Sequence, residues 1–334
     1  MALKPPVEVP QGAIRLNTDS QKLEFYAQDQ WWEMATDVPT LDGGSRGIFT
    51  LHTQTIDFLT IPTAGNSQDF GDLSSGRNNA ASVSSRTRAC FGSGYVPSPA
   101  ASTNIIDYVT IAQTGNATDF GDLSYLNYVP AAFSNQTRGI FAGGFNLPAG
   151  GNQNNISLIT IASTGDATDF GDLITAANSP DGTSSPTRGL IAGGQTPTRL
   201  NRIEYITIAS TGDAQDFGDL TQVKAGVGAL SSATRAVFCG GYAGPSASSV
   251  YKTIEKVEIA TKGNAVDYGD CTTIRRYCGG MSDCVRGVVA AGHNPSATNN
   301  IDYFSISTGG DAVDFGDQTT AAQTHGTSNG HGGL

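Results

Sequence analysis

The chain has 334 residues, of which 42 are glycine, 15% are charged and 38% are hydrophobic. Lys and Arg number 19 against 30 Asp and Glu, and the net charge of −11 argues against nucleic-acid binding, because such a surface repels phosphate backbones. No apolar run approaches 18 residues, which argues against membrane insertion, and the short β-type runs between glycine-rich turns predict an all-β fold.

Residues 1–40 have the alternation of a small three-stranded meander. The expected strands are Ala13–Asn17, Lys22–Ala27 and Trp31–Ala35, with turns at Asp19-Ser20 and Gln28-Asp29. So small a sheet buries little by itself, so we expect it to pack on the rest of its own chain, on copies of itself or on another protein. The aromatic residues expected in an assembly contact are Phe25, Tyr26, Trp31 and Trp32.

A repeat begins after this segment. The motif D-[FY]-G-D occurs six times at spacings of 50, 50, 47, 51 and 47, starting at Asp69, Asp119, Asp169, Asp216, Asp267 and Asp314. A recurring arginine accompanies it, at Arg46, Arg88, Arg138, Arg188, Arg235 and Arg286. In five copies the next arginine lies 19 residues after the start of the motif, so one structural unit is repeated six times.

The third copy shows the content of one unit. "TRGIFAGG" (137–144) and "ISLITIA" (156–162) are expected strands, "DFGDL" (169–173) is a third strand or tight corner, and residues 174–185 leave room for a fourth. Four short antiparallel strands in each of six units predict a six-bladed β-propeller over residues 41–334. The expected blade cores are about 45–73, 86–123, 137–173, 187–220, 234–270 and 285–317.

The two ends of this region are expected to meet. The tail after the last motif, residues 318–334, matches the stretch that precedes Thr-Arg-Gly in other copies, and then the sequence given ends. In other copies Thr-Arg-Gly and a strand follow this stretch, and the letters that match them here are "SRGIFT" (45–50), near the start of the region. We therefore predict that residues 318–334 supply the closing strand of the blade that begins at residue 45.

The recurring residues suggest structural roles. We expect the aromatic residue of D-[FY]-G-D to pack between neighbouring blades and the recurring arginine to pair with an aspartate of the motif. In "GDATDFGD" the carboxylates of Asp166, Asp169 and Asp172 leave calcium binding open beside the reading as a structural turn. A kinase is excluded, although D-F-G occurs, because the glycine-rich loop, its lysine and the H-R-D loop are missing.

Nothing in the sequence predicts a catalytic, cofactor or metal site. The five cysteines are irregularly spaced without a C-x-x-C pair, which argues against both disulfides and zinc. The four histidines are scattered, and no hydrolase or nucleotide-binding motif occurs. The chain is therefore expected not to be an enzyme, although a carboxylate pair for glycan hydrolysis on two blade loops stays open.

Variation between the repeats is concentrated after the glycine pairs. Five polar stretches of unequal length are expected to be loops on one face, where they act in recognition or as mere spacers; they are residues 95–104, 145–155, 195–202, 242–253 and 293–300.

The repeat resembles kelch repeats in its layout. Gly143-Gly144, Gly193-Gly194 and Gly240-Gly241 match the double glycine that ends a kelch strand. The kelch tryptophan is absent from every copy, and the aromatic residue of D-[FY]-G-D stands in its place. The resemblance implies a propeller that serves as a binding scaffold.

The chain also resembles virion structural proteins of tailed bacteriophages of the marine and cyanobacterial type. The residues that carry this resemblance are Gly12, Arg15, Asn17, Thr18, Asp19, Lys22, Leu23, Glu24, Tyr26 and Trp31, together with repeats such as "TRGIFAGG". It implies a tail-fibre or tail-associated protein that is held on the virion by residues 1–40 through other virion proteins and is made in the host cytoplasm. A host-surface glycan or protein is a candidate partner, and homo-oligomerisation stays open. The other functions considered are a capsid decoration protein, a cellular kelch-like binding module and a propeller glycan hydrolase.

Overall fold

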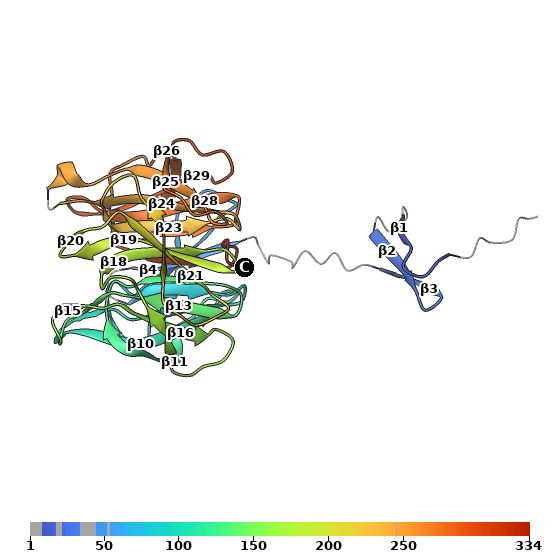
Figure 1. Ribbon diagram of the computed structural model, residues 1–334, viewed down its shortest axis with the longest axis horizontal. Coiled ribbons are helices and arrows are strands. Elements are labelled where there is room, and N and C mark those ends of the chain that lie inside the picture. Colours follow the sequence, from blue (N-terminus) through green and yellow to red (C-terminus); the bar gives the residue numbers. More distant parts are fainter. Residues whose placement is uncertain (1–8, 18–21, 34–44, 52–53, 245) are drawn as a thin grey trace, which may run out of the picture. The chain divides into compact units, whose positions relative to one another are not determined.

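The computed structural model describes residues 9–17, 22–33, 45–51, 54–244 and 246–334. The chain divides into two compact units, residues 1–43 (unit 1) and residues 44–334 (unit 2) (Figure 1). The described part of the chain is all-β apart from one 3-10 turn, η1 (Ala247–Ser249). No helix in these residues is long and apolar enough to cross a membrane.

Unit 1 is an antiparallel meander of β1 (Ile14–Asn17), β2 (Lys22–Ala27) and β3 (Gln30–Glu33). The three strands match the expected ones within the described residues, while the turn expected at Asp19-Ser20 lies outside them. Gln28 and Asp29 both have positive φ, 51° and 59°, as in the two-residue turns that join twisted strands.

Unit 2 contains six sheets with a four-stranded antiparallel path, numbered here in chain order of their second strands. The first strands all end at a serine and are β31 (His325–Ser328), β7 (Ala81–Ser84), β12 (Ala131–Ser134), β18 (Asn178–Ser184), β23 (Ala225–Ser231) and β27 (Gly279–Ser282). The second strands all begin at the recurring arginine and are β4 (Arg46–Thr50), β8 (Arg88–Gly92), β13 (Arg138–Ala142), β19 (Arg188–Thr196), β24 (Arg235–Tyr242) and β28 (Arg286–His293).

The outer half of each sheet contains the rest of the repeat. The third strands are β5 (Thr55–Thr60), β10 (Ala100–Thr110), β16 (Asn155–Thr160), β21 (Arg202–Thr207), β25 (Thr253–Glu258) and β29 (Ala297–Ser305). The fourth strands contain D-[FY]-G-D and are β6 (Gln68–Asp72), β11 (Thr118–Asn127), β17 (Thr168–Asp172), β22 (Gln215–Asp219), β26 (Val266–Asp270) and β30 (Val313–Asp317). The motif is therefore an edge strand rather than a corner.

Sheet 1 combines the two ends of unit 2. Strand β31 pairs with β4 in the register His325↔Thr50 to Ser328↔Gly47. This is the pairing expected from the match between the tail and the stretch before Thr-Arg-Gly. Asn329 continues it, since its Oδ1 accepts the backbone N–H of Arg46 at 2.7 Å.

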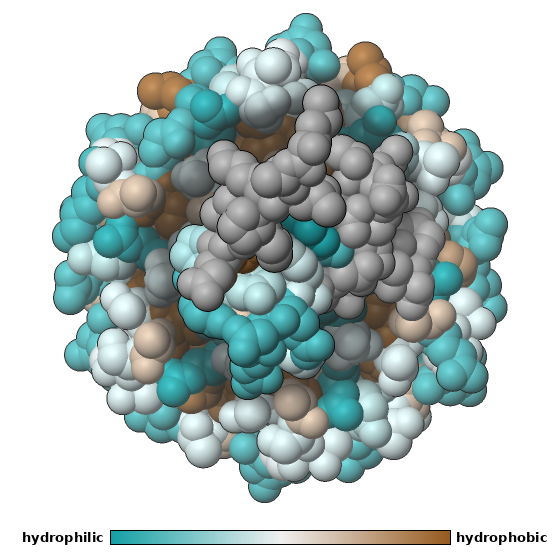
Figure 2. Space-filling view, turned by 90° about the vertical axis from the view of Figure 1, so that its right-hand side faces the viewer, coloured by the Kyte–Doolittle hydropathy of each residue, from teal (hydrophilic) through white to brown (hydrophobic). Residues whose placement is uncertain are grey.

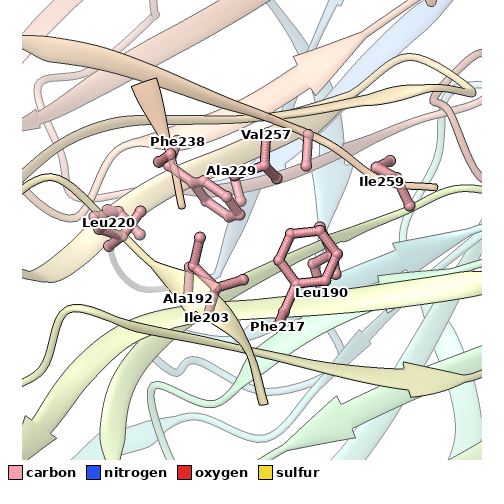
Figure 3. Close-up of a cluster of buried hydrophobic side chains, with 12 residues drawn as sticks. Leu190, Ala192, Ile203, Phe217, Leu220, Ala229, Phe238, Val257 and Ile259 are labelled. Carbon is pink, nitrogen blue, oxygen red and sulfur yellow. The ribbon is translucent and has the colours of Figure 1, made fainter. Parts of the chain in front are cut away.

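The core lies between neighbouring sheets. In each sheet a register shift opposite D-[FY]-G-D leaves the aromatic residue unpaired between its two neighbours, as Phe170 is between Asp169 and Gly171. Phe217 of sheet 4 then packs with Leu190 and Ile203 against Phe238 and Val257 of sheet 5 (Figure 3). Equivalent clusters join every consecutive pair of sheets and also sheets 6 and 1, so the expected packing role of the aromatic is confirmed.

The glycine of the motif allows neighbouring sheets to approach closely. Gly171 has a φ of +149°, and a Cβ there would lie 2.5 Å from the carbonyl oxygen of Gly212 in sheet 4. At the same contact the N–H of Gly212 donates to the carbonyl of Phe170 at 2.8 Å. Any side chain at position 171 would push β17 away from the turn at Gly212 that precedes β22.

Six buried serines at the ends of the first strands are bonded to one another, and we call them the serine cycle. Each hydroxyl donates to the backbone carbonyl of the serine in the preceding sheet at 2.6 to 2.9 Å, in the order Ser84, Ser134, Ser184, Ser231, Ser282, Ser328, with Ser84 donating to Ser328. The C-terminal residues lie over this cycle: the Nε2 atom of His331 is 3.1 Å from the carbonyl oxygen of Ser84.

The opposite end of unit 2 carries most of the additional short elements. The two-stranded hairpin of β14 (Phe145–Asn146) and β15 (Gly151–Asn152), together with β20 (Thr198–Arg199), lies at the end opposite the C-terminus (Figure 1). Strand β9 (Tyr95–Pro97) pairs with β10, and His293 of β28 pairs with Ala297 of β29, so four of the five expected loops are partly hydrogen-bonded hairpins. Seen from the C-terminal side, most of the apolar residues of unit 2 that are visible lie in recesses between hydrophilic and intermediate ones, and a few protrude at the rim (Figure 2).

Candidate functional site

Unit 1 presents five large apolar side chains on one face of its sheet, and we call this surface the apolar face. In the register of the meander Ile14 pairs with Phe25, which pairs with Trp32, and Leu16 pairs with Leu23, so all five project to the same side. Their exposed fractions run from 37% for Phe25 to 64% for Ile14. Five adjacent apolar side chains left open to solvent mark an interaction surface.

The other face of the meander is held by its own contacts. The guanidinium of Arg15 lies 4.1 Å from the ring centroid of Trp31 and its Nε donates to Glu24 at 2.7 Å. Tyr26 meets Trp31 edge to face at 5.3 Å. Of the aromatic residues expected in the assembly contact, Phe25 and Trp32 therefore belong to the apolar face, whereas Tyr26 and Trp31 stabilise the opposite one.

The sequence-based prediction missed three residues of the apolar face, Ile14, Leu16 and Leu23, because it weighed aromatic content alone. The signal was present: Ile14 and Leu16 alternate with Arg15 and Asn17, and Leu23 alternates with Glu24. Strict alternation in a meander assigns those residues to one side.

The recurring arginines do not pair with the aspartates of the motif, so that expectation is wrong. In every copy the guanidinium donates to the carbonyl of an isoleucine in the next sheet at 2.6 to 3.1 Å, for example Arg138 to Ile208 and Arg286 to Ile61. Several also stack on an aromatic ring, as Arg88 does on Tyr108 at 4.3 Å. The arginine satisfies a carbonyl that ends a strand, which explains why it recurs once per sheet.

The first aspartate of each motif is exposed, at Asp69, Asp119, Asp169, Asp216, Asp267 and Asp314. It lies on an edge strand, where a negative charge opposes the addition of a foreign strand. The Asp or Asn three residues before it makes an inter-sheet hydrogen bond instead, as Asp166 Oδ1 does when it accepts the backbone N–H of Asp122 in the preceding sheet at 3.0 Å. The Asp or Asn at this position thus serves an inter-sheet contact, and the described residues hold no group of three His, Cys, Asp or Glu that suits a metal ion.

Buried ion pairs do occur, at positions that the sequence did not single out. Arg77 and Asp107 in sheet 2 are fully buried and 2.9 Å apart, and burial lowers the pKa of the Arg77 guanidinium. Lys224 with Glu255 and Arg275 with Asp302 repeat this arrangement in sheets 5 and 6. The third strands of sheets 1 and 3 carry Asp57 and Ser157 at this place and lack the cation, which hides the pattern in the sequence.

The end of unit 2 opposite its C-terminus, which we call the loop face, breaks the repeat. One part of the loop face, formed by sheets 2 and 3, carries three aromatic rings in a row. The ring centroids of Tyr95 and Tyr128 are 5.6 Å apart, and those of Tyr128 and Phe145 are 5.7 Å apart. Next to them Asn178 donates to Asn152 at 2.7 Å, and Asn152 donates to the carbonyl of Gln195 at 2.9 Å. Aromatic faces and amides side by side suit recognition of a polar ligand.

The loop face continues into a basic part. The ring of Tyr242 has the guanidinium carbons of Arg199 and Arg276 at 4.9 and 4.7 Å from its centroid. Its hydroxyl lies 2.8 Å from that of Tyr277, and burial, followed by the proximity of Tyr242, raises the pKa of Tyr277. Burial and then the charge of Arg276 lower the pKa of His293, which keeps this imidazole neutral at pH 7.

A narrow cavity between the first strands is lined by two ionisable groups, the half-buried Asp181 and the buried His325. Burial raises the pKa of Asp181 to about 7 and lowers that of His325 to about 4. Asp181 accepts the backbone N–H groups of Gly182 and Ala229, which fixes it in place.

Comparison of the sequence with protein-family models and with curated proteins finds no match to this chain. The apolar face, the loop face and the repeat itself are the features of the chain that bear on its function.

Proposed function

We propose that unit 2 is a closed six-bladed β-propeller whose last blade is completed by the two ends of the chain. The serine cycle, the apolar clusters between consecutive sheets and the pairing of β31 with β4 support this arrangement. Electron-microscopy averages of the purified protein test it. Six sectors around a centre are expected, and an open arc or another number of sectors would contradict the proposal.

We further propose that the protein is a structural protein of a bacteriophage virion, in a tail-fibre or tail-associated position, and that it is not an enzyme. The apolar face of unit 1 carries the assembly part of this proposal, since five exposed apolar side chains on one small sheet need a partner surface. The resemblance of residues 12–31 and of the repeats to phage structural proteins supports the viral origin. Unit 1 would then bind other virion proteins and leave the loop face of unit 2 to meet the host surface.

Reconstitution tests the assembly role. Particles that lack the protein are mixed with the purified wild-type chain, re-isolated and counted by quantitative mass spectrometry. Phe25→Asp is expected to reduce incorporation strongly, because it places a charge in the centre of the apolar face. The matched control is Val313→Asp, which alters a half-exposed apolar side chain on an edge strand of unit 2 and should incorporate normally.

The outcomes separate the alternatives. Absence of the wild-type protein from particles, or equal incorporation of Phe25→Asp, contradicts the proposal. A few copies per particle indicate the tail, whereas copies in proportion to the capsid subunits indicate decoration of the capsid. An oligomer of the free wild-type chain that Phe25→Asp dissociates would instead assign the apolar face to self-association.

A further inference from the structure

Two half-buried arginines of the loop face lack an anionic partner among the described residues, unlike the fully buried cations of unit 2. The side chain of Arg199 makes no hydrogen bond or ion pair with any described residue. Among the same described residues, the Arg276 guanidinium has one polar contact, with His293 Nδ1 at 3.5 Å. The Nε atoms of both are buried without a hydrogen-bond partner. By contrast, Arg77, Lys224 and Arg275 each meet a carboxylate. A chain with net charge −11 thus keeps two cations unpaired on the same ring.

These arginines are not part of the repeat. The position of Arg276 in the connection to the first strand holds Asn78, Tyr128, Asn178 and Ala225 in the other sheets, each of which is bridged to the residue that follows the glycine pair. Arg199 is contributed by the β19–β20 hairpin of sheet 4, where Gln195 pairs with Arg199. A residue that the propeller required would recur in every sheet, so a requirement of the repeat does not explain either arginine.

The cluster offers the chemistry of a carboxylate site. The guanidinium is a planar fork that matches a carboxylate through two parallel N–H donors, and stacking on Tyr242 restricts its orientation in advance. Both guanidinium carbons lie within 4.9 Å of the centroid of the same ring, and this proximity to Tyr242 gathers the two cations where one anionic group can serve both. The neighbouring amides of Asn152 and Asn178 and the rings of Tyr95, Tyr128 and Phe145 supply donors, acceptors and stacking faces for the rest of a sugar chain.

We propose that the loop face binds an acidic saccharide, with a sugar carboxylate held between Arg199 and Arg276 beside Tyr242. The inference rests on the proposed function for the source of the saccharide, the host surface, whereas the binding itself is a property of the purified chain.

Calorimetry with the full-length protein tests the site. The probes are oligogalacturonate, in which every sugar carries a carboxylate, and a neutral dextran oligosaccharide of equal length. Oligogalacturonate should bind and weaken with added salt, and dextran should not bind. Arg199→Gln and Arg276→Gln are each expected to reduce the affinity about tenfold or more, as the loss of a charge-assisted hydrogen bond does. Lys262→Gln removes an exposed cation that stacks on Tyr205, outside the loop face, and should leave the affinity unchanged.

Four results would overturn the inference. They are no binding of oligogalacturonate, equal binding of dextran, an equal loss in Lys262→Gln, and complete displacement of the sugar by inorganic phosphate at the same concentration, which would show a site for small anions. If a variant does not fold, the salt dependence of oligogalacturonate binding to the wild-type protein still tests the proposal, because a carboxylate held by arginines must bind more weakly as salt is added. Absence of the protein from virions would contradict the proposed function and leave this binding result standing, and the reverse also holds.

Discussion

The buried pair of Arg77 and Asp107 gives the sharpest test of how unit 2 is held together. Asp107 Oδ2 accepts from Arg77 Nη1 at 2.9 Å, and its two oxygens also accept from the backbone N–H and the hydroxyl of Ser74. Arg77 additionally donates to the carbonyl oxygens of Ser93 and Phe91. Replacing Asp107 by alanine leaves a fully buried guanidinium without its counter-ion, which costs about 3–5 kcal/mol of unfolding free energy.

The matched control lies directly across the strand pair. Asp119 is the register partner of Asp107 but is exposed, so Asp119→Ala should change stability by no more than about 0.5 kcal/mol. For a unit of this size about 3–5 kcal/mol lowers the melting temperature by roughly 6–10 °C. Removing both charges with Arg77→Leu and Asp107→Leu should cost less than Asp107→Ala, because no buried charge is then stranded.

Far-UV circular dichroism during thermal and guanidinium unfolding measures these differences. Tryptophan fluorescence is unsuitable, since both tryptophans, Trp31 and Trp32, belong to unit 1. An effect of Asp119→Ala as large as that of Asp107→Ala would refute the reasoning, because it would place the important carboxylate in the recurring motif. A double variant less stable than Asp107→Ala would refute the stranded-charge argument.

Three further predictions concern the contacts between sheets. Gly171→Ala should destabilise unit 2 by more than about 2 kcal/mol in denaturant unfolding, while Gly165→Ala, which has a similar φ but open space around it, should cost clearly less; equal losses would contradict the close-contact argument. Burial lowers the pKa of His331 to about 4 from 6.5, so the folded state binds fewer protons than the unfolded one between these values. Its contribution, up to about 3 kcal/mol, is therefore complete above pH 6.5 and lost as pH falls to 4, and His331→Gln should flatten the melting curve against pH in this window; an unchanged slope would contradict this. Deleting residues 325–334 removes β31 and opens the apolar cluster between sheets 6 and 1, so the melting temperature should fall sharply, and a wild-type melt would contradict the pairing with β4.

The acid sensitivity predicted for His331 is partly offset elsewhere. Burial raises the pKa of Asp181 to about 7, so the folded state binds more protons than the unfolded state between pH 3.8 and 7. Asp181 therefore favours folding at low pH and loses this contribution as pH rises through 7. The comparison of His331→Gln with wild type removes this background, because Asp181 is present in both.

Much of the architecture was already determined by the sequence. The recurrence of D-[FY]-G-D and of the arginine located the fourth and second strands of every sheet, because a repeated local pattern needs the same strand in each copy. The likeness of residues 318–334 to the stretch before Thr-Arg-Gly predicted the pairing of β31 with β4 across the whole chain. Alternation in residues 13–33 predicted the meander, since side chains of a strand point to alternate faces.

Only the tertiary structure decided which groups meet. Arg138 and Asp169 looked like partners because both recur, yet Arg138 reaches the carbonyl of Ile208, 70 residues away in the next sheet, while Asp169 stays in solvent. Spacing within one repeat carries no information on the neighbouring sheet that supplies a partner. In the same way Arg199 of sheet 4 and Arg276 of sheet 6 converge on Tyr242 of sheet 5, and nothing local in the sequence marks them as neighbours. The repeat determines the scaffold, whereas the side chains that depart from it acquire a shared position only when the sheets pack side by side.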